Sequence, residues 1–190
     1  MNFPDSPLYT FKNFADLTVE ESEEVLNGRN DPEVRRWMTT DKVITIEEHT
    51  RFMSGLKDNP QVLYVRIERA GRFAGVYSLN DLADGSGQGG FWVTALTRER
   101  LLPLNVVFQG MNFIFRALGI ERIYGYQRQD NVSAIRLNTL LGLALSKSGA
   151  PSGEGLQMIE ITKLQWQQKT AQDAKLLKLM NRMENLNGTA

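Results

Sequence analysis

Two predicted helix starts place backbone N–H groups where an anion can bind. One helix begins near Pro103 and the other begins at Asp130 or Asn131, and each directly follows a strand-like run. Helices that follow neighbouring strands start at the same edge of a sheet, so we expect the two amino ends to lie side by side. Their free N–H groups and positive dipole ends favour a phosphate-bearing ligand. The alternative, which is the more common case, is that the capped helix starts are purely structural.

Composition excludes several kinds of chemistry. Cysteine is absent and histidine occurs once, at His49, so thiolate nucleophiles, disulfides and cysteine- or histidine-rich metal sites are excluded, and we predict no metal. Lys plus Arg equals Asp plus Glu at 22 each, so the whole-chain charge indicates neither a nucleic-acid nor a membrane partner. The first residues lack the pattern of a signal peptide, and no apolar run approaches the ~18 residues of a membrane span. We therefore predict a cytoplasmic protein.

The first half of the chain is predicted to form a strand, three helices and three further strands. Thr18 with Glu21, and Thr45 with Glu48, have the spacing of capping boxes. We expect the first helix to end near Gly28, because glycine commonly stops helices. The hairpin signal ERAGR joins two alternating runs. The expected elements are a strand at 8–14, helices at 17–30, 31–38 and 45–57, a hairpin at 61–82 and a strand at 89–97.

The second half is predicted to alternate helices and strands before a helical tail. Periodicity indicates a helix at 103–119, a strand at 120–127, a helix at 131–142, strands at 143–148 and 156–164, and one tail helix over 166–186. The tail carries an apolar stripe of Leu176, Leu179, Met180, Met183 and Leu186. An antiparallel meander followed by crossovers predicts an α/β (α+β) fold, with a mixed, mostly antiparallel sheet flanked by helices. We divide the chain into a domain at 1–165 and a helical extension at 166–190.

Three segments carry a family resemblance. The segment DNVSAIRLNTLLGL (130–143) resembles the recurrent N-x-x-A-I…L-G segment of the GCN5-related N-acetyltransferases (GNAT). The segments RNDPEVRRWMTTDKVITIEEHTRFMSGLK (29–57) and GVYSLNDL (75–82) are similar to the branch of that family that acetylates nucleotide-linked amino sugars, as in pseudaminic acid biosynthesis. The resemblance covers roughly residues 8–165. It implies a GNAT-like fold, acetyl-CoA as co-substrate, and direct attack of a substrate amine on the thioester without a covalent enzyme intermediate.

The resemblance also implies where acetyl-CoA would bind. Backbone groups of a central strand would hold the pantetheine arm, and the turn after that strand would bind the pyrophosphate. The family usually has Q/R-x-x-G-x-G/A in this turn, whereas this chain has RERLLPLN (98–105), in which leucines replace small residues and Pro103 removes a donor. The implied donor-binding residues are Val93, Thr94, Ala95, Arg98, Arg100, Leu101, Leu102, Leu104, Asn105 and Asn131.

The resemblance points to a second set of residues for proton transfer and acceptor binding. Relatives carry a glutamate where this chain has Tyr126 and a tyrosine where it has Asn138, so the usual base and acid are replaced. Tyr126, Asn138 and His49 are therefore the candidate catalytic residues, and a structural role is the alternative for each. The candidate acceptor-binding residues are Trp37, Met38, His49 and Asn80, which we expect to face one cavity.

Three functions remain open at this point. The first is acetyl transfer to the amine of a small acceptor, with a nucleotide-linked amino sugar as the first choice. The second keeps the fold and changes the acceptor to a protein N-terminus or another small amine. The third is a GNAT-like domain that has lost turnover and serves in binding or assembly. The apolar stripe of the tail needs a cover, either this domain's own sheet or a neighbouring copy, and we predict a homodimer to which the tail contributes.

Overall fold

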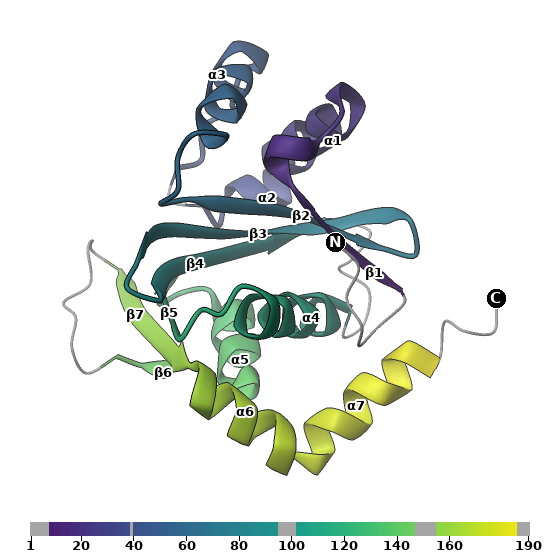
Figure 1. The fold of residues 1–190 in the computed structure, drawn as a ribbon, viewed down its shortest axis with the longest axis vertical. Coiled ribbons are helices and arrows are strands. Elements are labelled where there is room, and N and C mark those ends of the chain that lie inside the picture. Colours follow the sequence, from purple (N-terminus) through teal and green to yellow (C-terminus); the bar gives the residue numbers. More distant parts are fainter. Residues whose placement is uncertain (1–7, 39, 95–101, 147–154, 186–190) are drawn as a thin grey trace.

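The computed structural model describes residues 8–38, 40–94, 102–146 and 155–185. Within these residues the chain forms a seven-stranded sheet with helices on both of its faces (Figure 1). The strands are β1 (Tyr9–Asn13), β2 (Leu63–Arg69), β3 (Arg72–Ala83), β4 (Ser86–Val93), β5 (Arg122–Arg128), β6 (Ala144–Leu145) and β7 (Leu156–Thr162). The helices are the 3₁₀ helix η1 (Phe14–Asp16), and α1 (Val19–Asn30), α2 (Pro32–Arg35), α3 (Ile46–Leu56), α4 (Leu102–Ala117), α5 (Val132–Leu141), α6 (Lys163–Gln172) and α7 (Ala174–Asn185). No helix among the described residues is both long and apolar enough to cross a membrane.

The sheet is mixed, and a single pair of its described strands is parallel. Its order is β1-β2-β3-β4-β5-β7-β6, and neighbouring strands are antiparallel except β4 and β5. That pair is parallel because α4 crosses over between the two strands. Helices α1, α2 and α3 lie over one face, which we call the upper face as it stands in Figure 1, and α4 and α5 lie over the opposite, lower face. The predicted mixed, mostly antiparallel sheet flanked by helices is confirmed.

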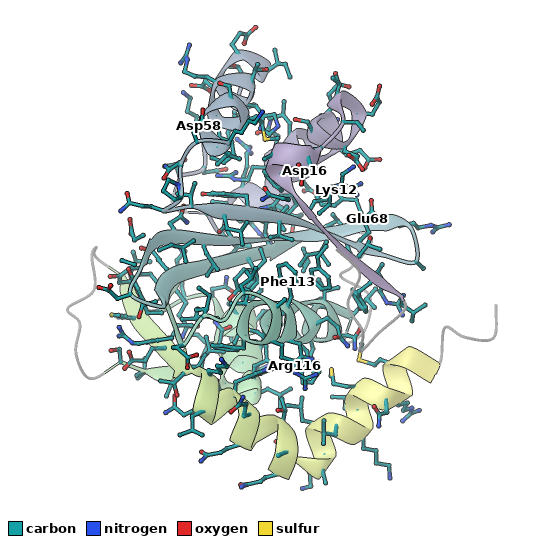
Figure 2. The ribbon with its side chains drawn as sticks, viewed as in Figure 1. Lys12, Asp16, Asp58, Glu68, Phe113 and Arg116 are labelled. Atoms are coloured by element: carbon teal, nitrogen blue, oxygen red, sulfur yellow. The ribbon has the colours of Figure 1, made fainter. Side chains whose placement is uncertain are left out.

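Two apolar clusters hold these layers together. The larger cluster fills the space between the lower face and α4, and it includes the buried side chains of Ile67, Leu79 and Phe113. Phe113 stacks on Phe11 of β1 with ring centroids 4.8 Å apart, while Arg116 lies on the far side of α4 beside the tail helices (Figure 2). The smaller cluster joins the upper face to α1 and α3. The sheet is therefore a rigid layer packed between two sets of helices.

The helix ends follow local sequence signals. In α1 and α3 the cap threonine accepts a bond from the backbone N–H of the glutamate three residues on, and that glutamate bonds back, so both predicted capping boxes are confirmed. Of the two candidate caps of α5, Asn131 takes the position, since its side chain accepts a bond from the backbone N–H of Ala134. The same helix ends at Gly142 as predicted, where a φ of 92° is tolerated by glycine.

Two predicted boundaries are wrong. Helix α1 runs past Gly28 to Asn30, because Gly28 serves packing rather than helix termination. A Cβ atom on Gly28 would lie 3.0 Å from the ring of Trp92, so only glycine lets α1 approach β4 this closely. Strand β4 begins at Ser86 rather than at residue 89, since a tight turn joins it directly to β3.

The tail forms two helices, so the single predicted helix is also wrong. Helix α6 starts at Lys163, before Trp166, and ends at Gln172. Asp173 then interrupts the helix, and its carboxylate accepts a bond from the backbone N–H of Leu176 at 2.9 Å. Such a bond caps the start of α7, which explains why the apolar period continues across a break in the backbone.

The tail stripe packs on α4 of its own chain. Trp166, Leu176 and Met180 are buried in the larger cluster, and the indole N–H of Trp166 donates to Oδ1 of Asn112 at 3.0 Å. A cavity of about 490 Å³ separates other parts of α4 from α6 and α7. Leu186 lies outside the described residues. The division of the chain after residue 165, which falls inside α6, and the homodimer stay predictions.

Candidate active site

Strands β4 and β5 stop pairing partway along their length, at a point that we call the fork. Their parallel ladder ends at Gln88 and Tyr124, and beyond it β4 pairs with β3 and β5 pairs with β7. Glycine is required at the fork, because a Cβ atom on Gly125 would lie 2.7 Å from the carbonyl oxygen of Gly89. Beyond it, the backbone groups that β4 turns away from β3 have no strand partner on β5. These groups can bind an extended ligand.

The predicted donor-binding residues gather at the carboxyl end of β4 and the start of α4. Val93 ends β4, and the hydroxyl of Thr94 donates to the backbone carbonyl of Phe73 at 3.2 Å, which ties this end to β3. Leu102 begins α4, and Leu104 is buried in the larger cluster. Four predicted donor-binding residues lie outside the described residues: Ala95, Arg98, Arg100 and Leu101.

The side-chain oxygen atoms of Asn105 and Asn131 are occupied within the protein. Asn105 is buried, its Oδ1 accepts a bond from the phenol of Tyr9, and its Nδ2 lies 3.6 Å from Sδ of Met180. Oδ1 of Asn131 accepts the capping bond from the backbone N–H of Ala134 at 3.0 Å. These side chains therefore hold the starts of α4 and α5 in place, and the backbone N–H groups of those starts are what a phosphate could meet.

Tyr126 and Asn138 lie on opposite faces of β5. Tyr126 is half-buried on the upper face, where its cross-strand partner is Met158. Asn138 projects from α5 on the lower face, 4 % exposed, and its Nδ2 donates to Oε1 of Gln127 at 2.7 Å. Oδ1 of Asn138 is buried without a hydrogen-bond partner. A buried amide of this kind can bind a ligand but cannot exchange a proton at neutral pH.

A row of polar side chains crosses the upper face at the fork. Asn80 pairs with Gln88, Gln88 with Tyr124, and Tyr124 with Glu160, so all four share one face of the sheet. Arg122 donates from Nε to Glu160 at 2.9 Å, and its guanidinium lies 5.4 Å from the ring centroid of Tyr124. The bond from Arg122 lowers the pKa of Glu160, so this carboxylate stays ionised and paired. The row offers amide, phenol and carboxylate groups to a polyhydroxylated ligand.

His49 connects α3 to α1. Its Nε2 lies 2.9 Å from the hydroxyl and 3.1 Å from the backbone oxygen of Ser22, and burial lowers the pKa of the imidazole. Its ring lies 6.4 Å from Phe52, whose ring is 4.9 Å from that of Tyr64, and the phenol of Tyr64 donates to Asn80 at 3.0 Å. His49 is thus linked to Asn80 through two aromatic rings. Among the described residues, no group of three or more His, Asp or Glu side chains is arranged to hold a metal ion.

Trp37 and Met38 follow α2 at the surface. Trp37 is 37 % exposed, and the guanidinium of Arg36 lies 5.2 Å from the centroid of its ring. Within the described residues, no hydrogen bond or ring contact joins Trp37 to His49. The expectation that Trp37, Met38, His49 and Asn80 face one cavity stays a prediction.

Two arginines that precede Trp37 in the chain, Arg29 and Arg35, contact the segment after it. Arg29 donates from Nη2 to the backbone oxygen of Thr40 at 3.3 Å, and Arg35 donates from Nη1 to that of Asp41 at 3.0 Å. Nη1 of Arg29 is buried and forms no hydrogen bond, whereas Nε of Arg35 forms an ion pair with Oδ1 of Asp41 at 3.4 Å. Burial and then the positive charge of Arg35 lower the pKa of Arg29, and the negative charge of Asp41 raises it. The unpartnered N–H group of Arg29 can bind an anion.

The comparisons with known proteins identify the family. Residues 13–144 match the family model described as an acetyltransferase (GNAT) domain. The chain belongs to the GNAT family. The predicted resemblance is thereby confirmed, and with it N-acetyl transfer as the reaction class and acetyl-CoA as the co-substrate.

Individual relatives agree with this assignment. The acetyltransferase PseH of Campylobacter jejuni is 26% identical over 127 residues, which cover 66% of this GNAT chain and 78% of that protein. The crystal structure of C. jejuni PseH in complex with acetyl coenzyme A has a TM-score of 0.65 at 17% identity, covering 82% of this chain and 99% of the other. Spermidine N-acetyltransferase from Vibrio cholerae, in complex with CoA and spermine, has a TM-score of 0.72 at 12% identity and covers 84% and 98%. The structural likenesses establish the GNAT fold.

Sequence reasoning missed several groups on the acceptor side of this GNAT domain. Gln88 and Tyr124 belong to the polar row; the alternation of Tyr124 with buried neighbours along β5 was an available signal, whereas β4 shows no such alternation. Arg29 and Arg35 stand inside the segment that carried the family resemblance, but the unsatisfied N–H group of Arg29 depends on burial that no spacing reveals.

Proposed function

We propose that this GNAT protein acetylates the amine of a nucleotide-linked amino sugar. The observation that carries the choice of acceptor is the buried Nη1 of Arg29, which has no hydrogen-bond partner and lies near the positive charge of Arg35. Phosphate oxygens suit such a group, because charge-assisted bonds from a guanidinium are short, strong and often bidentate. A diphosphate would also offset the repulsion between the two positive charges.

The same pair argues against a polycationic acceptor. A polyamine such as the spermine bound by the V. cholerae structure would meet the two positive charges of Arg29 and Arg35, which the single carboxylate of Asp41 does not balance. Like charges brought together in a partly buried site raise the free energy of binding. The pair thus favours an acceptor that carries its amine together with an anionic group.

Trp37 supports a nucleotide as the carrier of that anion. Its ring is 37 % exposed and lies two residues after Arg35 in the chain. Exposed aromatic faces suit stacking against a nucleobase, and they gain more when the base is held in place by its phosphates. We therefore assign Trp37 and Met38 to the base, the arginines to the diphosphate, and Asn80 to the sugar.

The transfer itself takes place at the fork. Backbone groups of β4 beyond the fork, including those of Val93, hold the pantetheine arm and orient the thioester carbonyl, while Thr94 ties the strand end to β3 through the hydrogen bond from its backbone N–H to the backbone oxygen of Ala74. The starts of α4 and α5 receive the pyrophosphate, with charge from Arg98 and Arg100. We assign the lower-face amide of Asn138 to the departing sulfur and the upper-face phenol of Tyr126 to the acceptor. Hydrogen bonds to the developing oxyanion and thiolate lower the barrier.

Two wider expectations accompany this proposal. The absence of cysteine fits a reducing compartment, which supports the cytoplasm as the place where the protein works. A homodimer stays our expectation for the assembly, although the stripe of the tail that first suggested it is covered by α4 of the same chain.

The test is a panel of acceptors assayed for CoA release with acetyl-CoA as donor. The panel contains a UDP-linked amino-deoxyhexose, the same amino sugar without the nucleotide, spermidine, and a peptide with a free N-terminus. We expect the UDP-linked amine to have the highest kcat/KM. A higher kcat/KM for spermidine or the peptide would overturn the acceptor, and acetyl-CoA that binds without any turnover would favour a lapsed binding module.

A further inference from the structure

Strand β3 contains a bulge beside the fork. Its ladder with β4 shifts between Asn80 and Ala83, so that Asp81 and Leu82 both stand opposite Gly87. Leu82 packs against the larger cluster, so its side chain is the one that points to the lower face at this position of the strand. The extra residue, Asp81, therefore stays exposed next to the half-buried Asn80 instead of turning into the core. Bulges commonly re-aim a side chain in this way next to functional sites.

The backbone at Asp81 is held in a left-handed conformation. Its φ is 51°, a region that is strained for residues other than glycine. Hydrogen bonds on both sides maintain it: the phenol of Tyr64 donates to Asn80, and the N–H of Leu82 donates to the backbone oxygen of Gln61, each at 3.0 Å. The surrounding contacts thus fix Asp81 beside the polar row.

Asp81 brings an unneutralised negative charge to that row. Over the described part of the chain it forms no ion pair or hydrogen bond, whereas Glu160 is held by Arg122. Asp81 is close enough to act on Tyr124: burial raises the pKa of Tyr124, and the charge of Asp81 raises it further. Tyr126, on the same face of β5 as Tyr124, contributes a phenol rather than a carboxylate.

We propose that Asp81 is a catalytic residue that binds the protonated amine of the acceptor and takes its proton. The proposal rests on the proposed acetyl transfer. A carboxylate favours an ammonium group and orients it toward the fork. One proton passes from the ammonium to Asp81 and on to solvent, and the nitrogen lone pair then attacks the thioester carbon. The carbon–sulfur bond breaks, and the second proton leaves nitrogen for sulfur, which gives the amide and the CoA thiol.

The test compares Asp81→Asn with Asp84→Asn. Asparagine tolerates the left-handed region and has the shape of aspartate, so the backbone is retained. Asp84 is the matched control, because it is also exposed and has a φ of 49° in the adjoining turn. Turnover is measured with the UDP-linked amino-deoxyhexose, or with whichever amine of the panel the wild type acetylates. Inhibition is measured with the analogue that carries a hydroxyl in place of the amine.

We expect Asp81→Asn to lower kcat/KM for the amine by about 10- to 100-fold. The inhibition constant of the hydroxyl analogue and the Tm should stay the same, Asp84→Asn should match the wild type, and Asp81→Glu should recover part of the loss. An equal loss for amine and hydroxyl analogue would show a structural role, and wild-type turnover in Asp81→Asn would overturn the proposal. If the wild type acetylates another amine but not the UDP-linked one, only the proposed acceptor is overturned. If it acetylates none of the amines, both the proposed acceptor and the proposed role of Asp81 are overturned.

Discussion

The two faces of the sheet present their ligand-facing groups in different ways. On the lower face, the amides of Asn105 and Asn138 are buried and bonded to neighbours in the protein, and the atom left without a partner is the neutral Oδ1 of Asn138. On the upper face, Arg29 keeps a buried N–H group without a hydrogen-bond partner, and Asp81 keeps its charge unpaired among the described residues. The lower face therefore leaves a neutral amide oxygen for a ligand, and the upper face leaves charged groups.

This difference follows from what each face has to recognise. The donor is shared across the GNAT family, so strand geometry and helix starts can serve it with few special side chains. The acceptor differs between relatives, as spermine beside the V. cholerae protein illustrates, so side chains must distinguish it. Donor binding should depend on backbone geometry at the fork, and acceptor choice should depend on upper-face charges.

The largest effect is expected at the fork itself. Gly125→Ala places a Cβ atom 2.7 Å from the backbone oxygen of Gly89, which cannot move without separating the strands. We expect a loss of about 3 kcal/mol in the free energy of unfolding and weaker acetyl-CoA binding. Gly90→Ala is the control, because its Cβ would meet the movable hydroxyl of Ser78 at 3.1 Å. Urea unfolding and calorimetry measure both; equal stability of the two variants would contradict a constrained fork.

Acetyl-CoA should stabilise the folded chain without any acceptor. Saturation at 100 times its Kd adds about 2.7 kcal/mol to the free energy of unfolding by mass action. The measurement is the Tm at increasing acetyl-CoA, with the free amino sugar as a control that should leave it almost unchanged. A Tm that does not respond to millimolar acetyl-CoA would exclude the donor site at the fork.

A smaller effect is expected for the phenol that faces the acceptor. Tyr126→Phe removes a hydroxyl from the upper face and should lower kcat by about tenfold, with the KM for acetyl-CoA unchanged. Tyr124→Phe tests whether any phenol of the polar row affects turnover. We expect its fall in log kcat to be less than half of that in Tyr126→Phe. If kcat survives in Tyr126→Phe, the residue has a packing role.

The smallest effect concerns stability against pH. Burial lowers the pKa of His49 below its ordinary value of 6.5, so the unfolded chain binds this proton more readily than the folded chain. The wild type should therefore lose stability as the pH falls below 6.5, toward the lower pKa of the folded state. His49→Gln should lose less between about pH 7.5 and about pH 5.5 in urea unfolding. Parallel losses would show that His49 is not buried as a neutral imidazole.

Predictions from the sequence were accurate where the cause is local. The capping boxes at Thr18 and Thr45, and the left-handed stop at Gly142, each depend on residues three or four positions apart. The break at Asp173 was missed because the apolar stripe keeps its period across it, although an aspartate three residues before Leu176 is itself a cap signal.

The site could be predicted only in part, because its residues come from separate strands and helices that meet only in the folded sheet. Tyr126 and Asn138 were chosen from the resemblance, and which face each occupies followed only from the structure. The bulge that exposes Asp81 shifts a ladder within a few residues, and alternation alone would have placed that side chain in the core. Registers of separate strands and local irregularities are set by packing, which no single segment encodes.

The most direct test of the account is the preference for a nucleotide on the acceptor. The ratio of kcat/KM for the UDP-linked amino sugar to that for the free amino sugar is measured in the wild type and in a variant with Arg29→Gln and Arg35→Gln. We predict a ratio of about 100 or more in the wild type, since two charge-assisted bonds contribute about 3 kcal/mol together, and a ratio near unity in the variant, with the KM for acetyl-CoA unchanged. A wild type without preference, or a variant that keeps it, would contradict the account.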